Sequence, residues 1–251
     1  MFTLGSNNTT SMSFLFEDTA FSAYYLEHLY PLLFFFLFGL FVIVFARNKL
    51  NKQEQRTLGV ALAFIPFIAV FLRIYYEYAT GVLTIENGLP LHLCRILAVV
   101  APAIMFFKNR LVLAMFYLFA LSGTLIANLT PDLPEGFPNL SYFCYWMLHS
   151  GLIVVALYGI FVHHVRVNLR DIFNVYIASN LLLVIMYGIN YLLGSNYLYT
   201  MRTPDSASLL DHMGPWPWYL LSGQGVMLVL MFLVYIPFLI WKEKEIIECK
   251  N

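Results

Sequence analysis

The chain has 251 residues, of which 61% are hydrophobic and only 11% are charged, and its mean hydropathy is +0.74. Soluble domains carry about 25% charged residues, so this composition excludes an ordinary water-soluble domain. The 14 basic residues are balanced by 14 acidic residues, and this balance excludes a strongly basic nucleic-acid-binding protein.

Seven apolar stretches, taken in chain order, are long enough to cross the hydrocarbon core of a bilayer, which takes about 17–25 helical residues. They cover residues 29–47, 57–79, 89–107, 111–129, 140–163, 171–193 and 216–241. The sequence therefore predicts an all-α, polytopic membrane protein with seven transmembrane helices, in a single domain that covers residues 1–251.

The basic residues are distributed unevenly between the two sets of connections. Those that follow the first, third, fifth and seventh spans are Arg47, Lys49, Lys52, Arg56, Lys108, Arg110, Arg166, Arg170, Lys242, Lys244 and Lys250. The opposite connections hold only Arg202, and Arg73 and Arg95 lie inside spans. Cytoplasmic loops are enriched in Lys and Arg, so we expect a cytoplasmic C-terminus, an N-terminus outside, and a location in the cell membrane.

Polar and ionisable side chains within or beside the spans fall on the side that we expect to be extracytoplasmic. An ionisable group at the centre of a span costs on the order of 2.5–3.5 kcal/mol by insertion scales, so it usually marks function or pairing. In chain order these residues are Arg73, Glu77, His92, Cys94, Arg95, His149, Asn190, Asp211 and His212, followed by the interfacial Trp216 and Trp218. Their common side predicts a polar cavity that opens toward the outer leaflet.

Simple structural roles are the alternative for several of these residues. Arg73 and Glu77 are spaced i,i+4 and would neutralise each other. His92 and Arg95 share a helix face at i,i+3 and would extend toward the outer headgroups. A lone cysteine such as Cys94 is commonly a small buried hydrophobe.

His149 is harder to assign a structural role. It lies about nine residues into the fifth span, or roughly 13 Å at 1.5 Å per residue, with no charged neighbour in sequence. A cysteine attacks as the thiolate and needs a base within reach, so His149 is the candidate base for Cys94. His92 lies about 200° around the helix from Cys94 and is not expected to be the base. Arg95 would contribute a positive field.

Two alternatives involve the same groups. Cys94 and Cys144 both fall near the start of a span, and a disulfide between them would remove the nucleophile. Cys249 lies in the charged tail and is expected to be inert. No HxxxH or HExxH spacing supports a metal site, whose ligands would be His92, His149, Asp211 and His212. We therefore expect no metal and no other cofactor.

A thiol nucleophile at this depth suits acyl transfer, because the ester carbonyls of a phospholipid lie just below its headgroup. Arg73, Arg95 or His212 would hold the phosphate through charge-assisted contacts. The remaining residues expected at the substrate site are Glu77, His92, Asn190, Asp211, Trp216 and Trp218. The expected partners are membrane phospholipids or lysolipids, and not nucleic acid.

Three motifs carry a resemblance to a known family. They are "LPLHLCRI" at 89–96, "YFCYWMLHSGL" at 142–152 and "DHMGPWPWYLL" at 211–221, of which GPWPWY is the most specific. Over essentially the whole chain, the sequence resembles the YwaF-type bacterial integral-membrane proteins and, more distantly, the eukaryotic transmembrane protein 164 family. The resemblance implies a phospholipid acyltransferase whose cysteine and histidine correspond to Cys94 and His149.

Two functions follow from these observations. The leading hypothesis is a membrane-embedded acyltransferase or transacylase that acts at the outer leaflet through an acyl-cysteine intermediate. It would move an acyl chain between lipids, or from a lipid to a lipid-linked acceptor. The alternative is a non-enzymatic lipid or small-molecule binder, or a transporter, with an outward-facing polar pocket. The sequence shows no inverted-repeat signal of a secondary transporter.

Overall fold

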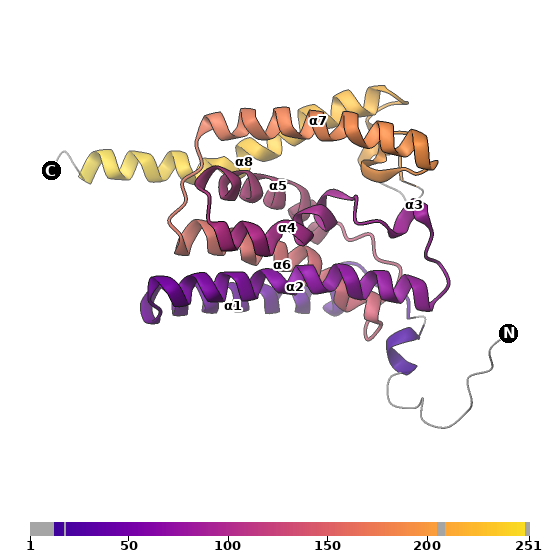
Figure 1. Cartoon of the computed structure of the whole chain (residues 1–251), viewed down its shortest axis with the longest axis horizontal. Coiled ribbons are helices and arrows are strands. Elements are labelled where there is room, and N and C mark those ends of the chain that lie inside the picture. The colour runs from indigo at the N-terminus through magenta and orange to yellow at the C-terminus, as the bar shows by residue number, and fades with distance from the viewer. Residues whose placement is uncertain (1–12, 18, 205–208, 249–251) are drawn as a thin grey trace.

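The computed structural model describes residues 13–17, 19–204 and 209–248, and within these ranges every regular element is a helix. The long helices lie side by side, with α1 and α2 along one edge and α7 and α8 along the other (Figure 1). Cys249 lies outside the described residues. The elements are η1 (Ser13–Phe16), α1 (Leu26–Lys49), α2 (Lys52–Ala79), α3 (Ile85–Gly88), α4 (Leu93–Phe107), α5 (Arg110–Leu129), α6 (Leu140–Val162), α7 (Leu169–Leu193), η2 (Tyr197–Tyr199), η3 (Leu209–His212) and α8 (Trp218–Glu248).

The predicted spans correspond closely to the observed helices. In the described part of the chain, six helices are long and apolar enough to cross a membrane: α1, α2, α5, α6, α7 and the Trp218–Ile240 part of α8. Each includes nearly all of its predicted range, since an apolar run of this length can pair its backbone groups in hydrocarbon only as a helix. The all-helical, multi-pass prediction is confirmed, and the orientation stays a prediction.

The third predicted span differs from the others. Its helix, α4, begins at Leu93 rather than at 89, because Pro90 disfavours helical backbone at Leu89 and His92 is an extended N-cap with ψ 143°. The 15 residues of α4 span about 22 Å, which is less than the roughly 30 Å of a bilayer core. Non-helical backbone at such depth is tolerated where protein covers it or where it lines a cavity.

The later start of α4 also changes the expected position of His92 relative to Cys94. His92 was placed about 200° from Cys94 on the assumption of one continuous helix. That premise is wrong, because His92 precedes the first helical residue. Its position relative to Cys94 is set by the turn before α4, where the Leu91 N–H donates to the Leu89 carbonyl at 2.8 Å.

The centre of the bundle is α6, which packs against α1, α2, α4 and α5. Two thirds of its apolar span is buried inside the protein, compared with 17% for α1 and 11% for α8, which face outward. Close packing of α2 depends on Gly59, because a Cβ there would lie 2.8 Å from the Met105 Cε atom. Small residues of this kind let membrane helices approach.

Helix ends opposite the predicted cavity are fixed by local caps. Asn51 and Glu54 form a capping box at the start of α2, with side-chain to backbone distances of 2.8–3.0 Å. Asp171 closes a second capping box at the start of α7 and is also bound by both terminal nitrogens of Arg110. The pair ties α5 to α7, so these ends hold the bundle in register.

Candidate functional site

The polar residues predicted inside the spans gather at one end of the bundle, which we call the site end. It is the end at which α2, α5 and α7 finish and α1, α4, α6 and α8 begin. In Figure 1 it also carries α3. The expectation that these residues share one side of the membrane therefore corresponds to a shared end of the bundle.

Glu77 joins two arginines from two helices. Its Oε1 atom lies 2.9 Å from Arg73 Nε on the same helix and 2.9 Å from Arg95 Nη2 on α4. The i,i+4 contact expected from sequence is thus confirmed, and Arg95 joins it from a second helix. Glu77 is only 4% exposed, and its Oε2 atom has no hydrogen-bond partner among the described residues. One carboxylate oxygen therefore links α2 to α4 while the other is left without a donor.

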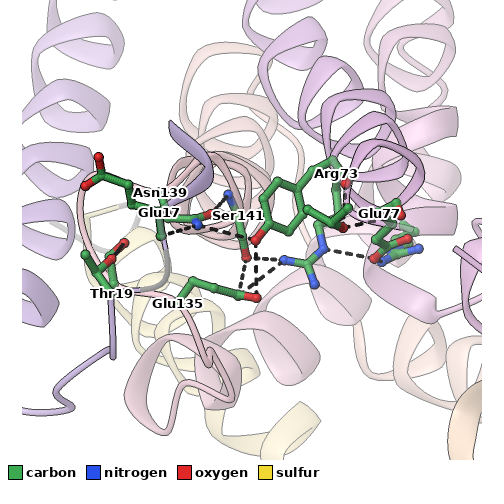
Figure 2. A network of polar contacts seen from close by, with 11 residues as sticks. Glu17, Thr19, Arg73, Glu77, Glu135, Asn139 and Ser141 are labelled. Atoms are coloured by element: carbon green, nitrogen blue, oxygen red, sulfur yellow. Dashed lines mark hydrogen bonds and ion pairs between the residues drawn. The ribbon is translucent and has the colours of Figure 1, made fainter. Parts of the chain in front are cut away.

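Arg73 is also bound on its other side, by the connection before α6. Its Nη1 atom donates to Ser141 Oγ and lies 3.9 Å from Glu135 Oε2, while Ser141 Oγ donates to the same Glu135 oxygen at 2.8 Å. Figure 2 shows the guanidinium between this pair and Glu77. The two arginines and two carboxylates balance in charge, and the Arg73 side chain keeps 26% of its surface exposed. Phosphate binding by Arg73 stays a prediction.

Sequence reasoning did not find Glu135 or Ser141. Both lie in the acidic connection "TPDLPEGFPNLSYF", where an acidic residue directly before a span was the available signal. The same connection is held in place by residues 17 and 19–21, which precede α1 and which we call the strap. Thr19 Oγ1 donates to the Gly136 carbonyl at 2.9 Å. The Asn139 amide donates to the Glu17 carbonyl at 2.9 Å (Figure 2). This strap covers the outer side of the Arg73 network.

Cys94 and His149 lie on two helices that pack together, α4 and α6. Both are partly buried, and Cys94 is a free thiol, as is the buried Cys144. His149 Nδ1 lies 3.0 Å from the Tyr145 carbonyl oxygen. Because a carbonyl can only accept, Nδ1 carries the proton, and in the neutral imidazole the lone pair is then on Nε2. No hydrogen bond joins Cys94 to His149 among the described residues.

Two residues connect the thiol and the imidazole. Arg95 interacts electrostatically with both Cys94 and His149. The Tyr145 ring contacts the His149 ring in a tilted arrangement, with centroids 4.3 Å apart, and Tyr145 also interacts with Cys94. Cys144 lies within reach of the same arginine. The site end therefore brings the predicted nucleophile, the predicted base and the predicted positive field into one neighbourhood.

The family of the chain follows from comparison with known proteins. The TMEM164 family model matches residues 21–235. The chain belongs to the TMEM164 family. The matched range contains Cys94, His149 and the Arg73–Glu77–Arg95 cluster, and the resemblance noted from the three motifs is confirmed at this level. Its YwaF-type bacterial assignment stays a prediction. Comparison with curated proteins and with solved structures gave no match.

In this TMEM164-family chain, Asn190 anchors a loop. The side chain is 1% exposed, and its amide nitrogen donates to the Tyr197 carbonyl and to Thr200 Oγ1, both at 2.8 Å. Its oxygen accepts from Ser195 Oγ at 2.7 Å and from the Tyr197 N–H at 2.8 Å. All four bonds join Asn190, near the end of α7, to residues of the α7–α8 connection. Substrate binding by Asn190 stays a prediction, and the structure gives the residue an anchoring role.

The remaining predicted residues lie along the same connection. Asp211 and Trp216 line a hollow of about 500 Å³, together with Arg202 and Tyr219. The Tyr219 hydroxyl donates to the Tyr199 carbonyl at 2.5 Å, and the Tyr199 ring contacts His92. The α7–α8 connection therefore reaches His92 at the start of α4. The other two residues predicted in this region are His212, which ends η3, and Trp218, which begins α8 and is 62% exposed.

One histidine that sequence reasoning passed over has a structural role. His28 is buried at the start of α1, where its Nδ1 accepts from the Tyr24 N–H at 3.0 Å and its Nε2 lies 2.8 Å from the Asn128 carbonyl. Both ring nitrogens are thus used, which contrasts with His149. In the described part of the chain, no metal-binding cluster is formed by the four residues considered as ligands, which are His92, His149, Asp211 and His212.

Proposed function

We propose that this protein is a membrane-embedded acyltransferase that transfers a fatty acyl chain between phospholipids and lysolipids through Cys94. The observation that carries the proposal is the placement of a free thiol and of an imidazole with an available Nε2 on packed helices beside Arg95. Membership of the TMEM164 family supports a membrane function. The reaction would take place at the extracytoplasmic leaflet of the cell membrane.

The first half-reaction forms a thioester. His149 Nε2 takes the proton of the Cys94 thiol, and the sulfur attacks the ester carbonyl of the donor phospholipid. The carbon–oxygen bond of the ester breaks, and the leaving lysophospholipid oxygen takes the proton back from His149. Tyr145 holds the imidazole by its carbonyl and its ring.

The second half-reaction releases the acyl chain. A hydroxyl of the acceptor lysolipid gives its proton to His149 as its oxygen attacks the thioester, and the leaving Cys94 sulfur recovers that proton. Glu77 Oε2 is buried without a donor among the described residues, so it is the atom that we assign to accept a hydrogen bond from a substrate hydroxyl. Each step balances without a cofactor.

The test uses the full chain reconstituted in phosphatidylcholine vesicles that contain an isotope-labelled acyl donor and a lysophospholipid acceptor. We expect labelled diacyl product and a hydroxylamine-sensitive acyl adduct on the protein. Cys94→Ala removes both, and His149→Ala slows product formation by roughly 10²–10⁴-fold, the usual contribution of a general base. Cys144→Ala is the matched control, because it removes the other free thiol of the site end, and it keeps both signals.

Two results would contradict the proposal. A folded Cys94→Ala protein with undiminished acyl exchange would exclude the covalent mechanism. Wild-type protein that binds labelled phospholipid but forms neither adduct nor product would favour the alternative of a non-enzymatic lipid binder. Peptide mapping under non-reducing conditions, run on the same samples, tests whether Cys94 and Cys144 are both free, as the structure has them.

A further inference from the structure

An apolar groove of about 650 Å³ lies between the start of α1 and the start of α6, and none of the residues predicted for the catalytic or substrate site lines it. Its volume is within the roughly 300–1,000 Å³ typical of small-molecule sites. The lining is apolar or aromatic except for Glu27. It consists of Leu26, Glu27, Tyr30, Pro31, Phe34, Phe35, Phe137, Tyr142, Phe143, Trp146 and Met147.

The surroundings of the groove identify its apolar occupant. Its first wall is α1, the most apolar of the membrane-crossing helices, with outward-facing side chains such as Leu33 at 54% and Phe36 at 67% exposure. A surface of this kind is in contact with lipid rather than water in a multi-pass protein. A lipid acyl chain is therefore the apolar ligand that such surroundings would offer to the groove.

The polar end of the groove indicates the headgroup. Glu27 lies in the first turn of α1, and its carboxylate forms no ion pair among the described residues. One of its oxygens accepts from the Ser22 N–H. The second oxygen stays available beside Gly136. A carboxylate at the end of an acyl-chain groove complements a cationic headgroup and repels an anionic one.

A second unpaired group belongs to the opposite wall of the groove, which is α6. Trp146 is 2% exposed, and its indole nitrogen has no hydrogen-bond acceptor among the described residues. A buried N–H without an acceptor costs free energy, so a site that supplies an oxygen is favoured. The Trp146 position is about six residues into α6, or roughly 10 Å along the helix. The ester oxygens of a phospholipid are the acceptors that a membrane offers near its headgroups.

We propose that this groove is a binding site for one zwitterionic phospholipid, with an acyl chain along the apolar walls and a choline or ethanolamine group beside Glu27. The site is separate from the cysteine and its base but lies close to the base, since the Trp146 and Tyr145 ring centroids are 5.4 Å apart and the Tyr145 ring contacts the His149 ring. Binding at the groove does not require the proposed reaction.

The experiment is photo-crosslinking in the full chain with Cys94→Ala, so that no acyl transfer contributes. Two probes carry the same ether-linked diazirine chain and differ only in headgroup, which is choline in one and anionic glycerol in the other. Each is placed in vesicles with equal parts of phosphatidylcholine and phosphatidylglycerol. Labelling is mapped on residues 26–35 and 142–147, relative to Leu181 and Val184 of α7, which are 61% and 70% exposed.

We expect groove labelling by the choline probe to exceed that by the glycerol probe by about 2- to 5-fold, the range for a partly exposed charge pair. Glu27→Gln removes the preference but keeps the labelling. Leu26→Trp and Met147→Trp fill the groove from its two walls and reduce labelling there with both probes, while α7 labelling is unchanged. Leu26 is 61% exposed, so its substitution does not disturb the core.

Either of two outcomes would overturn the proposal. In the first, groove and α7 residues are labelled in the same ratio by both probes, which is what nonspecific surrounding lipid would give. In the second, Glu27→Gln leaves the headgroup preference intact. The acyl-exchange assay on protein with an intact Cys94 is separate, so loss of exchange with retained groove labelling counts against the proposed function alone.

Discussion

Tyr145 holds His149 in two ways: its carbonyl oxygen accepts the His149 Nδ1–H at 3.0 Å, and the two ring centroids lie 4.3 Å apart. The Tyr145 hydroxyl in turn donates to the Ala127 carbonyl at 2.7 Å, which ties α6 to the end of α5. The orientation of the imidazole is therefore set by a residue one helical turn earlier, and not by a carboxylate.

Removing the Tyr145 ring tests this positioning role. Tyr145→Ala keeps the backbone carbonyl but loses the ring contact, and we expect acyl exchange to fall by about 2- to 10-fold, since such ring pairs contribute about 0.5–1.5 kcal/mol. Tyr145→Phe keeps the ring and should stay within about 2-fold of wild type by the same reasoning. Equal losses in the two variants would show that the hydroxyl, not the ring, matters. The measurement is the initial exchange rate in vesicles.

Glu77 offers the largest expected effect on stability. Glu77→Ala removes the carboxylate that Arg73 and Arg95 share in a buried position, and breaking a buried pair costs about 3–5 kcal/mol. The exposed Glu54→Ala, which removes half of a capping box, should cost only about 1 kcal/mol. Thermal unfolding in detergent compares the two. A Glu77→Ala protein as stable as Glu54→Ala would contradict the pairing.

Gly136 is predicted to be intolerant of a side chain. A Cβ there would lie 2.7 Å from Glu27 Oε2 and 3.0 Å from the Ala20 carbonyl oxygen, so Gly136→Ala forces the strap away from the α5–α6 connection. We expect a loss of about 1–3 kcal/mol and faster hydrogen exchange at residues 19–21. Gly188→Ala is the matched control, because nothing lies within 4 Å of its Cβ, and in mid-helix it should gain about 0.5–1 kcal/mol.

The anchoring role of Asn190 predicts a local effect. Asn190→Ala removes four hydrogen bonds, each with a net contribution of about 0.5–1.5 kcal/mol, and releases the loop at 195–200. Limited proteolysis should then cut this loop, whereas Asn180→Ala, which loses bonds only to Tyr176 and Gln224, leaves it resistant. If the loop stays resistant and phospholipid binding is lost instead, Asn190 is a substrate residue as the sequence suggested.

The spans were predictable because the bilayer fixes how long an apolar run must be. The same rule failed at α4, where the chain stays non-helical from Leu89 to His92. The length and hydropathy of a segment do not show whether other parts of the protein cover its backbone. The helix boundary near His92 therefore needed the structure.

The candidate site was predictable only where its contacts are local. The Arg73–Glu77 pair follows from i,i+4 spacing alone, but the bond from Arg95 to Glu77 depends on how α4 packs against α2. Ser141 lies in the first turn of α6 and Glu135 in the connection before it. Their contacts with Arg73 have no signature in sequence spacing. Contacts between residues of different helices depend on how the helices pack, and this packing cannot be read from the spacing of residues in one sequence.

The short α4 helix also bears on which membranes suit this protein. Its helical length falls roughly 8 Å short of a typical hydrocarbon core. We therefore expect the polar backbone before Leu93 to lie at a depth where the neighbouring helices are still surrounded by lipid tails. Each added ångström of bilayer thickness places that backbone farther from bulk water, at a modest free-energy cost. Lipids with shorter tails should therefore favour the arrangement around Cys94, and thicker bilayers, such as those rich in sterol, should disfavour it.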